Sequence, residues 1–211
     1  MSGELEAMAE SLYTNQVPKM WEKKAYPSLK PLAGWIDDLV ARIKFVQGWI
    51  DGGKPPTYWI SGFFFPQAFL TGTLQNYARK HVVSIDSLSY NFEVMTRAAE
   101  DILAKPEDGC YIYGLYLEGA RWDAVNMRLA ESRPKELYTT MAAIWLRPQA
   151  DREVPKDGIY ICPCYKTLQR AGTLSTTGHS TNFVLSIELP SDEAQNHWIK
   201  RAVALICALD Y

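Results

Sequence analysis

A change of hydrophobic periodicity near residue 85 constrains the fold of this chain more than any other feature. Before it, apolar residues recur at the three- and four-residue intervals of amphipathic helices, and after it apolar and polar residues alternate as in half-buried strands. Helices followed by strands are typical of an α+β fold, in which the two kinds of element are segregated. We therefore predict a helical portion at residues 1–85 and a strand-rich portion at residues 86–211.

The clearest helix is predicted at residues 32–50. Apolar side chains follow the i, i+3, i+4, i+7 spacing there, and Gly52 and Gly53 favour its end. The apolar stripe includes Trp35 and Trp49. Because helices with this period usually bury such a face, we expect the stripe to face the core and not to form a binding groove.

Other helices are predicted at residues 4–16 and from Pro66 to about His81, where proline suits the first helical turn. The apolar run at residues 58–65 fits either a short strand or the lead-in to a helix.

Six extended segments are predicted after residue 85. They cover residues 88–94, 111–118, 138–146, 159–165, 183–189 and 198–207. No long helical pattern separates them, so parallel crossovers are not expected. This favours an antiparallel sheet closed into a barrel of about six strands.

Composition excludes several classes of function. A chain of 211 residues with 47% apolar residues can form a core, and its 22 basic and 24 acidic residues create no field for nucleic acid or an anionic membrane. The apolar runs are far shorter than the roughly 20 residues of a membrane helix.

The first residues show no targeting pattern. The four cysteines are expected to be free thiols in a reducing compartment.

The densest group of reactive residues lies at residues 162–190. A metal site there would draw on Cys162, Cys164, His179 and either Cys110 or His197. Structural zinc sites usually separate paired cysteines by two to four residues, whereas here a single proline intervenes. On a strand the two cysteines share one face, so we expect packed free thiols and no metal site.

A catalytic site would use Cys164 or Ser180 as the nucleophile and His179 or His81 as the base. No nucleophile elbow or other local signature accompanies these residues, so we expect His179 to be a turn residue. A small Cys/His-dependent hydrolase and a ligand-binding β-barrel remain as alternatives.

A phosphate-binding loop is not predicted. The glycine-rich loop at residues 172–178 lacks the Walker spacing and its lysine, and Lys54 is followed by Pro55 where a P-loop needs serine or threonine. We therefore predict no catalytic, cofactor-binding or metal residues, and a function in binding.

Four long blocks resemble the C-terminal domain of dynein heavy chains, and the resemblance covers nearly the whole sequence. The blocks are PPTYWISGFFFPQAFLTGTLQNYARKHVVSIDSLSYNFEV (55–94), GCYIYGLYLEGARWD (109–123), ICPCYKTLQRAGTLSTTGHSTNFVLSIELPSD (161–192) and HWIKRAVALICALD (197–210). Residues 165–184 are most similar to axonemal, inner-arm heavy chains. Cys164 stands where the family pattern has an aliphatic residue, and Ala202 where glycine is common.

The resemblance implies a helical portion followed by a β-barrel, lying against a ring of AAA+ modules. The parent would be an ATP-driven microtubule motor of the cytoskeleton, in the axoneme of cilia or flagella. ATP and magnesium would belong to the parent ring, so the domain itself is expected to be non-catalytic, with no cofactor. Its implied partners are the ring modules of the same heavy chain and, through the parent, the dynein complex and microtubules, without nucleic acid or membrane.

Overall fold

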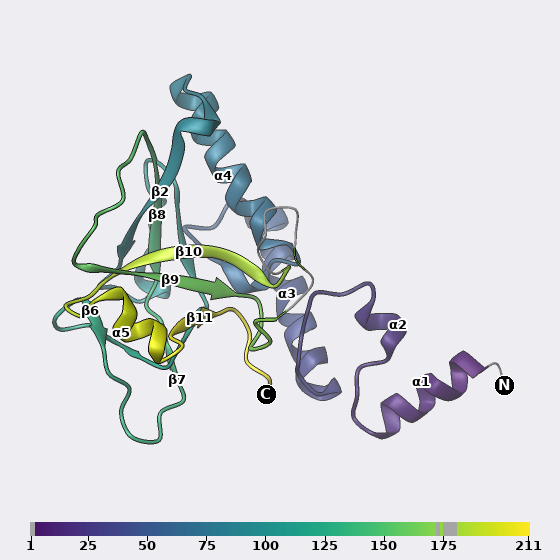
Figure 1. Ribbon diagram of the computed structural model, residues 1–211. Coiled ribbons are helices and arrows are strands. Elements are labelled where there is room, and N and C mark those ends of the chain that lie inside the picture. The colour runs from purple at the N-terminus through teal and green to yellow at the C-terminus, as the bar shows by residue number, and fades with distance from the viewer. Residues whose placement is uncertain (1–2, 172–173, 175–180) are drawn as a thin grey trace.

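The computed structural model describes residues 3–171, 174 and 181–211, and it has the predicted α+β class, with N-terminal helices followed by many strands (Figure 1). A short strand at residues 57–59 and a short helix at residues 195–200 are exceptions to the predicted separation. The α-helices are α1 Gly3–Tyr13, α2 Lys19–Glu22, α3 Leu32–Gly52, α4 Pro66–His81 and α5 Gln195–Lys200. Short 3-10 turns occupy Ile60–Gly62, Ile85–Ser87 and Ala99–Asp101. The predicted helices at residues 4–16, 32–50 and 66–81 are therefore confirmed.

The described strands form three sheets. Their bounds are β1 Thr57–Trp59, β2 Leu88–Val94, β3 Cys110–Tyr113, β4 Tyr116–Glu118, β5 Arg121–Asp123, β6 Arg128–Ala130, β7 Tyr138–Thr140, β8 Ile144–Ala150, β9 Ile159–Tyr165, β10 Phe183–Pro190 and β11 Ala204–Ile206. The sheet orders are β1-β3-β8-β2, β10-β9-β11-β4-β7 and β5-β6.

The strand-rich portion differs from the prediction in its strand number and pairing. The described residues hold eleven strands and not six, because β4 to β7 are only three residues long and too short to show alternation. β1 pairs with β3, and β11 with β9, in parallel. The other pairings are antiparallel as expected, so the sheets are mixed. The parallel pairs were not predicted because β1 lies before residue 85, with α4 in its crossover to β3, and because β11 was not separated from the short helix α5. The pairings of the described strands form no closed ring, so the barrel is not confirmed.

The segment predicted to be extended at residues 198–207 is instead the end of α5 followed by β11. Trp198 is 1% exposed, and its indole Nε1 donates a hydrogen bond to Ser191 Oγ at 2.7 Å. Every residue from 203 to 209 is buried, so this run shows no alternation that could separate strand from helix.

The core lies between the two larger sheets and is filled by side chains. The largest side chains with less than 2% exposure are Trp198, Tyr160, Ile60, Ile112, Leu115, Leu117, Ile144, Leu146, Ile187, Leu189, Leu205 and Ile206. The Tyr160 hydroxyl donates to the Val203 carbonyl at 2.7 Å, which satisfies a polar atom in this apolar interior. A ligand-binding barrel needs an open apolar cavity at this place, so the packing argues against that alternative.

A buried guanidinium joins α3 to the rest of the protein. Arg42 is 3% exposed, and its Nε donates to Asp38 Oδ2 at 2.6 Å, one helical turn earlier. The guanidinium lies 3.6 Å from the centre of the Tyr26 ring, and its Nη1 donates to the Phe63 carbonyl at 3.3 Å. These contacts determine which face of α3 is turned inward.

Ala202 has a left-handed backbone, with φ of 52°. Its Cβ makes this conformation unfavourable by about 1–2 kcal/mol, whereas glycine adopts it freely. The glycine that the resemblance implies at this position would adopt this backbone without strain. The carbonyl of Ala202 accepts a hydrogen bond from Arg170 Nη1 at 2.7 Å, which helps to hold the turn before β11.

The substitution Ala202→Gly is expected to stabilise the protein by about 0.5–1 kcal/mol, because relief of the left-handed strain exceeds the added backbone entropy of the unfolded state. Urea denaturation of both variants measures the difference. Ala204→Gly, in buried β11, is the control and should lower stability, since it loses a packed methyl group. A lower stability of Ala202→Gly would contradict the assignment of strain.

Candidate interaction surface

The cysteines that were considered for reactive or metal-binding roles lie in the core, as the prediction of packed thiols requires. Cys162 and Cys164 project from the same face of β9, as the alternation predicted, and both are 0% exposed. Cys207 had not been grouped with them, yet its Sγ lies 3.9 Å from Cys164 Sγ, because parallel pairing brings β11 beside β9. Cys110 is on β3, and all four thiols are free.

Burial makes these thiols unreactive. It raises the pKa of Cys110 to about 12 and raises the pKa of Cys162 further. The hydrogen bond with Cys207, together with burial, raises the pKa of Cys164 well above its ordinary value. Because the thiolate is the form that attacks substrates and binds metals, this environment opposes both roles and the hydrolase alternative. The prediction of packed free cysteines is confirmed.

The two described histidines pair with carboxylates and not with thiols. His81 Nε2 lies 3.1 Å from Asp108 Oδ2, and its ring contacts that of Tyr77. His197 Nε2 lies 2.7 Å from Glu131 Oε1. His179, Ser180 and all of the loop at residues 172–178 except Leu174 lie outside the described residues. Among those described, no three His, Cys, Asp or Glu side chains are grouped to hold a metal.

At pH 8, iodoacetamide is expected to modify Cys110, Cys162 and Cys164 slowly in the folded protein. Their raised pKa values lie above this pH, so the thiols stay protonated, and only the thiolate reacts with the reagent. Mass spectrometry over time measures the modification, and the urea-unfolded protein provides the fast reference. Modification of folded Cys164 at the unfolded rate would show a catalytic-type thiolate.

The most unusual surface among the described residues is the outward face of α3. Ile36, Val40, Ile43 and Ile50 are 42%, 42%, 56% and 71% exposed. These residues belong to the stripe that was expected to face the core, and that expectation was wrong for them. α3 carries two apolar stripes, and only the one containing Trp35 and half-buried Trp49 packs inward.

The inward stripe packs on an aromatic cluster. Trp49 meets the rings of Tyr58 and Phe63 edge to face, with centroids 5.2 Å and 6.0 Å apart, and Phe45 meets Phe63 at 5.4 Å. Such pairs add about 0.5–1.5 kcal/mol each beyond area burial. The rotation of α3 about its axis is therefore well determined, and the second stripe has to face away from the protein.

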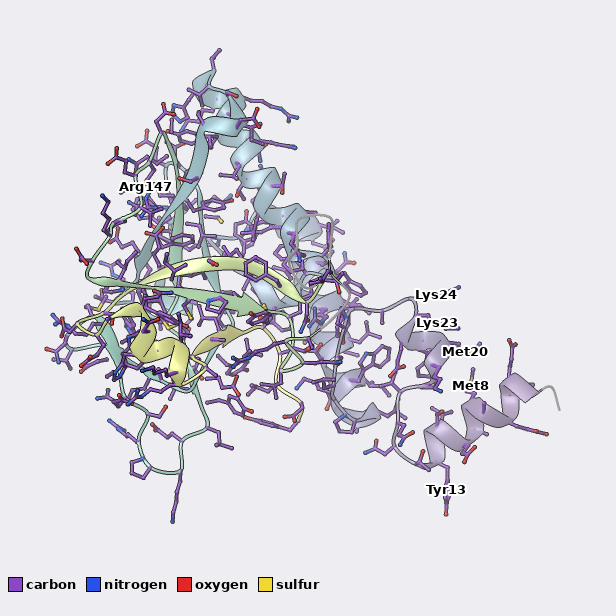
Figure 2. All side chains as sticks on the ribbon, viewed as in Figure 1. Met8, Tyr13, Met20, Lys23, Lys24 and Arg147 are labelled. Carbon is purple, nitrogen blue, oxygen red and sulfur yellow. The ribbon has the colours of Figure 1, made fainter. Side chains whose placement is uncertain are left out.

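α1 and α2 form an arm that stands apart from the sheets (Figure 1). α1 buries none of its residues, and Tyr13 is 92% exposed. A surface groove of about 510 Å³ lies between α1 and α2, and Figure 2 shows Met8 and Met20 projecting toward it. Met side chains adapt to the shape of a partner, so Met8 and Met20 form an apolar part of a groove whose other lining residues are mostly polar or charged.

Hydrogen bonds connect the arm to the start of α3, although a non-helical segment separates α2 from α3. The backbone N–H of Leu32 donates to the Asn15 carbonyl at 2.9 Å, and that of Ala33 donates to Asn15 Oδ1 at 3.2 Å. These bonds tie the arm to the first turn of α3. None of the described helices is both long enough and apolar enough to span a bilayer.

Comparison with known proteins identifies the family. The family model for the C-terminal domain of dynein heavy chains matches residues 1–207. Over all 211 residues, the sequence is 65% identical to dynein axonemal heavy chain 1 of Mus musculus and 62% identical to that of Homo sapiens, and over 210 residues it is 53% identical to human dynein axonemal heavy chain 12. These alignments cover the whole of this protein, but only 5% to 7% of the relatives. The protein belongs to the family of C-terminal domains of dynein heavy chains.

Proposed function

We propose that this protein is the non-catalytic C-terminal domain of an axonemal, inner-arm dynein heavy chain. The observation that carries the proposal is the family match over residues 1–207, together with relatives named as axonemal heavy chains. In this proposal the parent is an ATP-driven microtubule motor in the axoneme of cilia or flagella. ATP and magnesium bind in its AAA+ ring, and the dynein complex and microtubules are reached through the parent.

The domain packs against AAA+ modules of the same heavy chain. The outward stripe of α3 supports this, because contiguous exposed apolar residues are typical of surfaces that bind another protein. The groove between α1 and α2 adds a mixed surface, with Met8 and Met20 among polar and charged residues. The domain acts on the motor if these contacts differ between nucleotide states, since only differential contacts shift a conformational equilibrium.

Residues 1–85 and 86–211 work as one domain in this proposal. Parallel pairing of β1 with β3 supports this, because it joins a segment before residue 85 to the sheets after it. The two larger sheets form one barrel-like unit, since β10, at the edge of one sheet, contacts β2, at the edge of the other.

Ile43→Asp in the intact heavy chain is expected to weaken docking of the domain, because the new carboxylate would be buried at the contact without a partner. If the buried carboxylate costs about 2 kcal/mol of docking free energy, the undocked population rises roughly thirtyfold. The rate at which trypsin cleaves between the ring and the domain measures this population, because only the undocked form exposes the connecting segment. Val125→Asp, at a residue that is 91% exposed on the turn between β5 and β6, is the matched control. Equal cleavage rates for the two variants would contradict ring contact through α3.

The domain alone is expected not to bind ATP, because the nucleotide sites of the proposed motor lie in the ring. Isothermal titration calorimetry with ATP and magnesium measures this, after circular dichroism has verified the fold. Binding at micromolar concentration, accompanied by hydrolysis, would overturn the non-catalytic assignment.

A further inference from the structure

The outward stripe of α3 has the spacing of a helix-packing seam. Ile36, Val40, Ile43, Gln47 and Ile50 follow one another at intervals of four, three, four and three residues. This alternation keeps side chains in line along a partner helix, with an average repeat of 3.5 residues. A flat or irregular partner surface would not require that regularity.

Charged residues flank the seam at the same repeat. Asp37, Lys44 and Asp51 follow each other at seven-residue intervals and lie along one side of the stripe, all exposed. Within the described residues, neither Asp37 nor Lys44 forms an ion pair, while Asp51 Oδ1 accepts a hydrogen bond from Gln47 Nε2 at 2.8 Å. In packed helix pairs the residues at such flanking positions form ion pairs that select the partner.

We propose that α3 packs, through this seam, against one amphipathic helix from elsewhere in the same heavy chain. The partner helix carries aliphatic residues at 3.5-residue spacing, a polar residue opposite Gln47, and flanking residues that are basic, acidic and basic at seven-residue intervals. The order of charges on α3, acidic, basic and acidic, is the same from either end of the helix. It therefore selects the charges of the partner helix but not whether that helix runs parallel or antiparallel to α3. This inference rests on the proposed function, because it names the element that the ring supplies.

A second copy of α3 does not meet these requirements. In an antiparallel pair centred on the seam, Asp37 would face Asp51 of the second copy and Lys44 would face its own equivalent. In a parallel pair the charges would face Leu39 and Val46, which flank the other side of the stripe. Like charges repel, and charges against aliphatic side chains lose water without gaining a partner. The charge pattern therefore favours a different helix.

Zero-length cross-linking with a carbodiimide tests the proposal in the purified intact heavy chain. The reagent joins a carboxylate to a lysine amine at ion-pair distance, and mass spectrometry identifies the linked peptides. Asp37 and Asp51 are expected to link to lysines, and Lys44 to an acid, with all three partners on one helix and seven residues apart. Lys44→Glu should lose the Lys44 link and reduce the other two, while Lys156→Glu, in an exposed turn, should leave all three unchanged.

Each other outcome has a defined meaning. Links from other faces of the domain to the ring, without any from these three residues, would overturn the seam and leave the proposed function standing. Links to a segment without helical spacing would overturn the seam as well. Links between the α3 helices of two molecules would show that the partner is a second copy of α3, and would overturn the proposal of a helix from the same heavy chain. The absence of any link between domain and ring would contradict the proposed function itself.

Discussion

The buried guanidinium of Arg42 is the interaction on which the surface of this protein depends. A buried charge is costly unless it is paired, and here Asp38, the Tyr26 ring and the Phe63 carbonyl surround it. Burial, followed by the hydrogen bond with Asp38, raises the pKa of Tyr26, so its hydroxyl stays neutral beside this pair. With Arg42 inside, the helix has one rotation about its axis, and Ile36, Val40, Ile43 and Ile50 then face outward.

Periodicity predicted the helix itself but not the face that it buries. Its bounds followed from the apolar spacing and from Gly53, whose φ of 78° suits glycine at a helix end. The inward and outward stripes, however, are both apolar, and they look alike in sequence. The residue that distinguishes the inward stripe from the outward one is Arg42, which is buried although its charge predicts an exposed position. The four- and three-residue alternation from Ile36 to Ile50 was nevertheless visible and is the signal that could have identified the surface.

The strand-rich portion shows the same division between local pattern and long-range contact. Alternation in β9 predicted that Cys162 and Cys164 share a buried face, because a strand of seven residues has room for the pattern. It could not predict that Cys207 lies beside Cys164, since that contact depends on parallel pairing with β11 across the intervening α5. Three-residue strands and a six-residue helix are determined by their neighbours more than by their own residues. The segment that looked most reactive therefore contributes to packing and to family identity.

In the proposed function the domain acts through what its outer surface contacts. Carbene footprinting of the intact heavy chain and of the separate domain, read at individual residues by mass spectrometry, tests this most directly. The account predicts that Ile36, Val40, Ile43 and Ile50 are labelled in the separate domain and protected in the heavy chain, while Val125 is labelled equally in both. Equal labelling of the four α3 residues in both forms would contradict it.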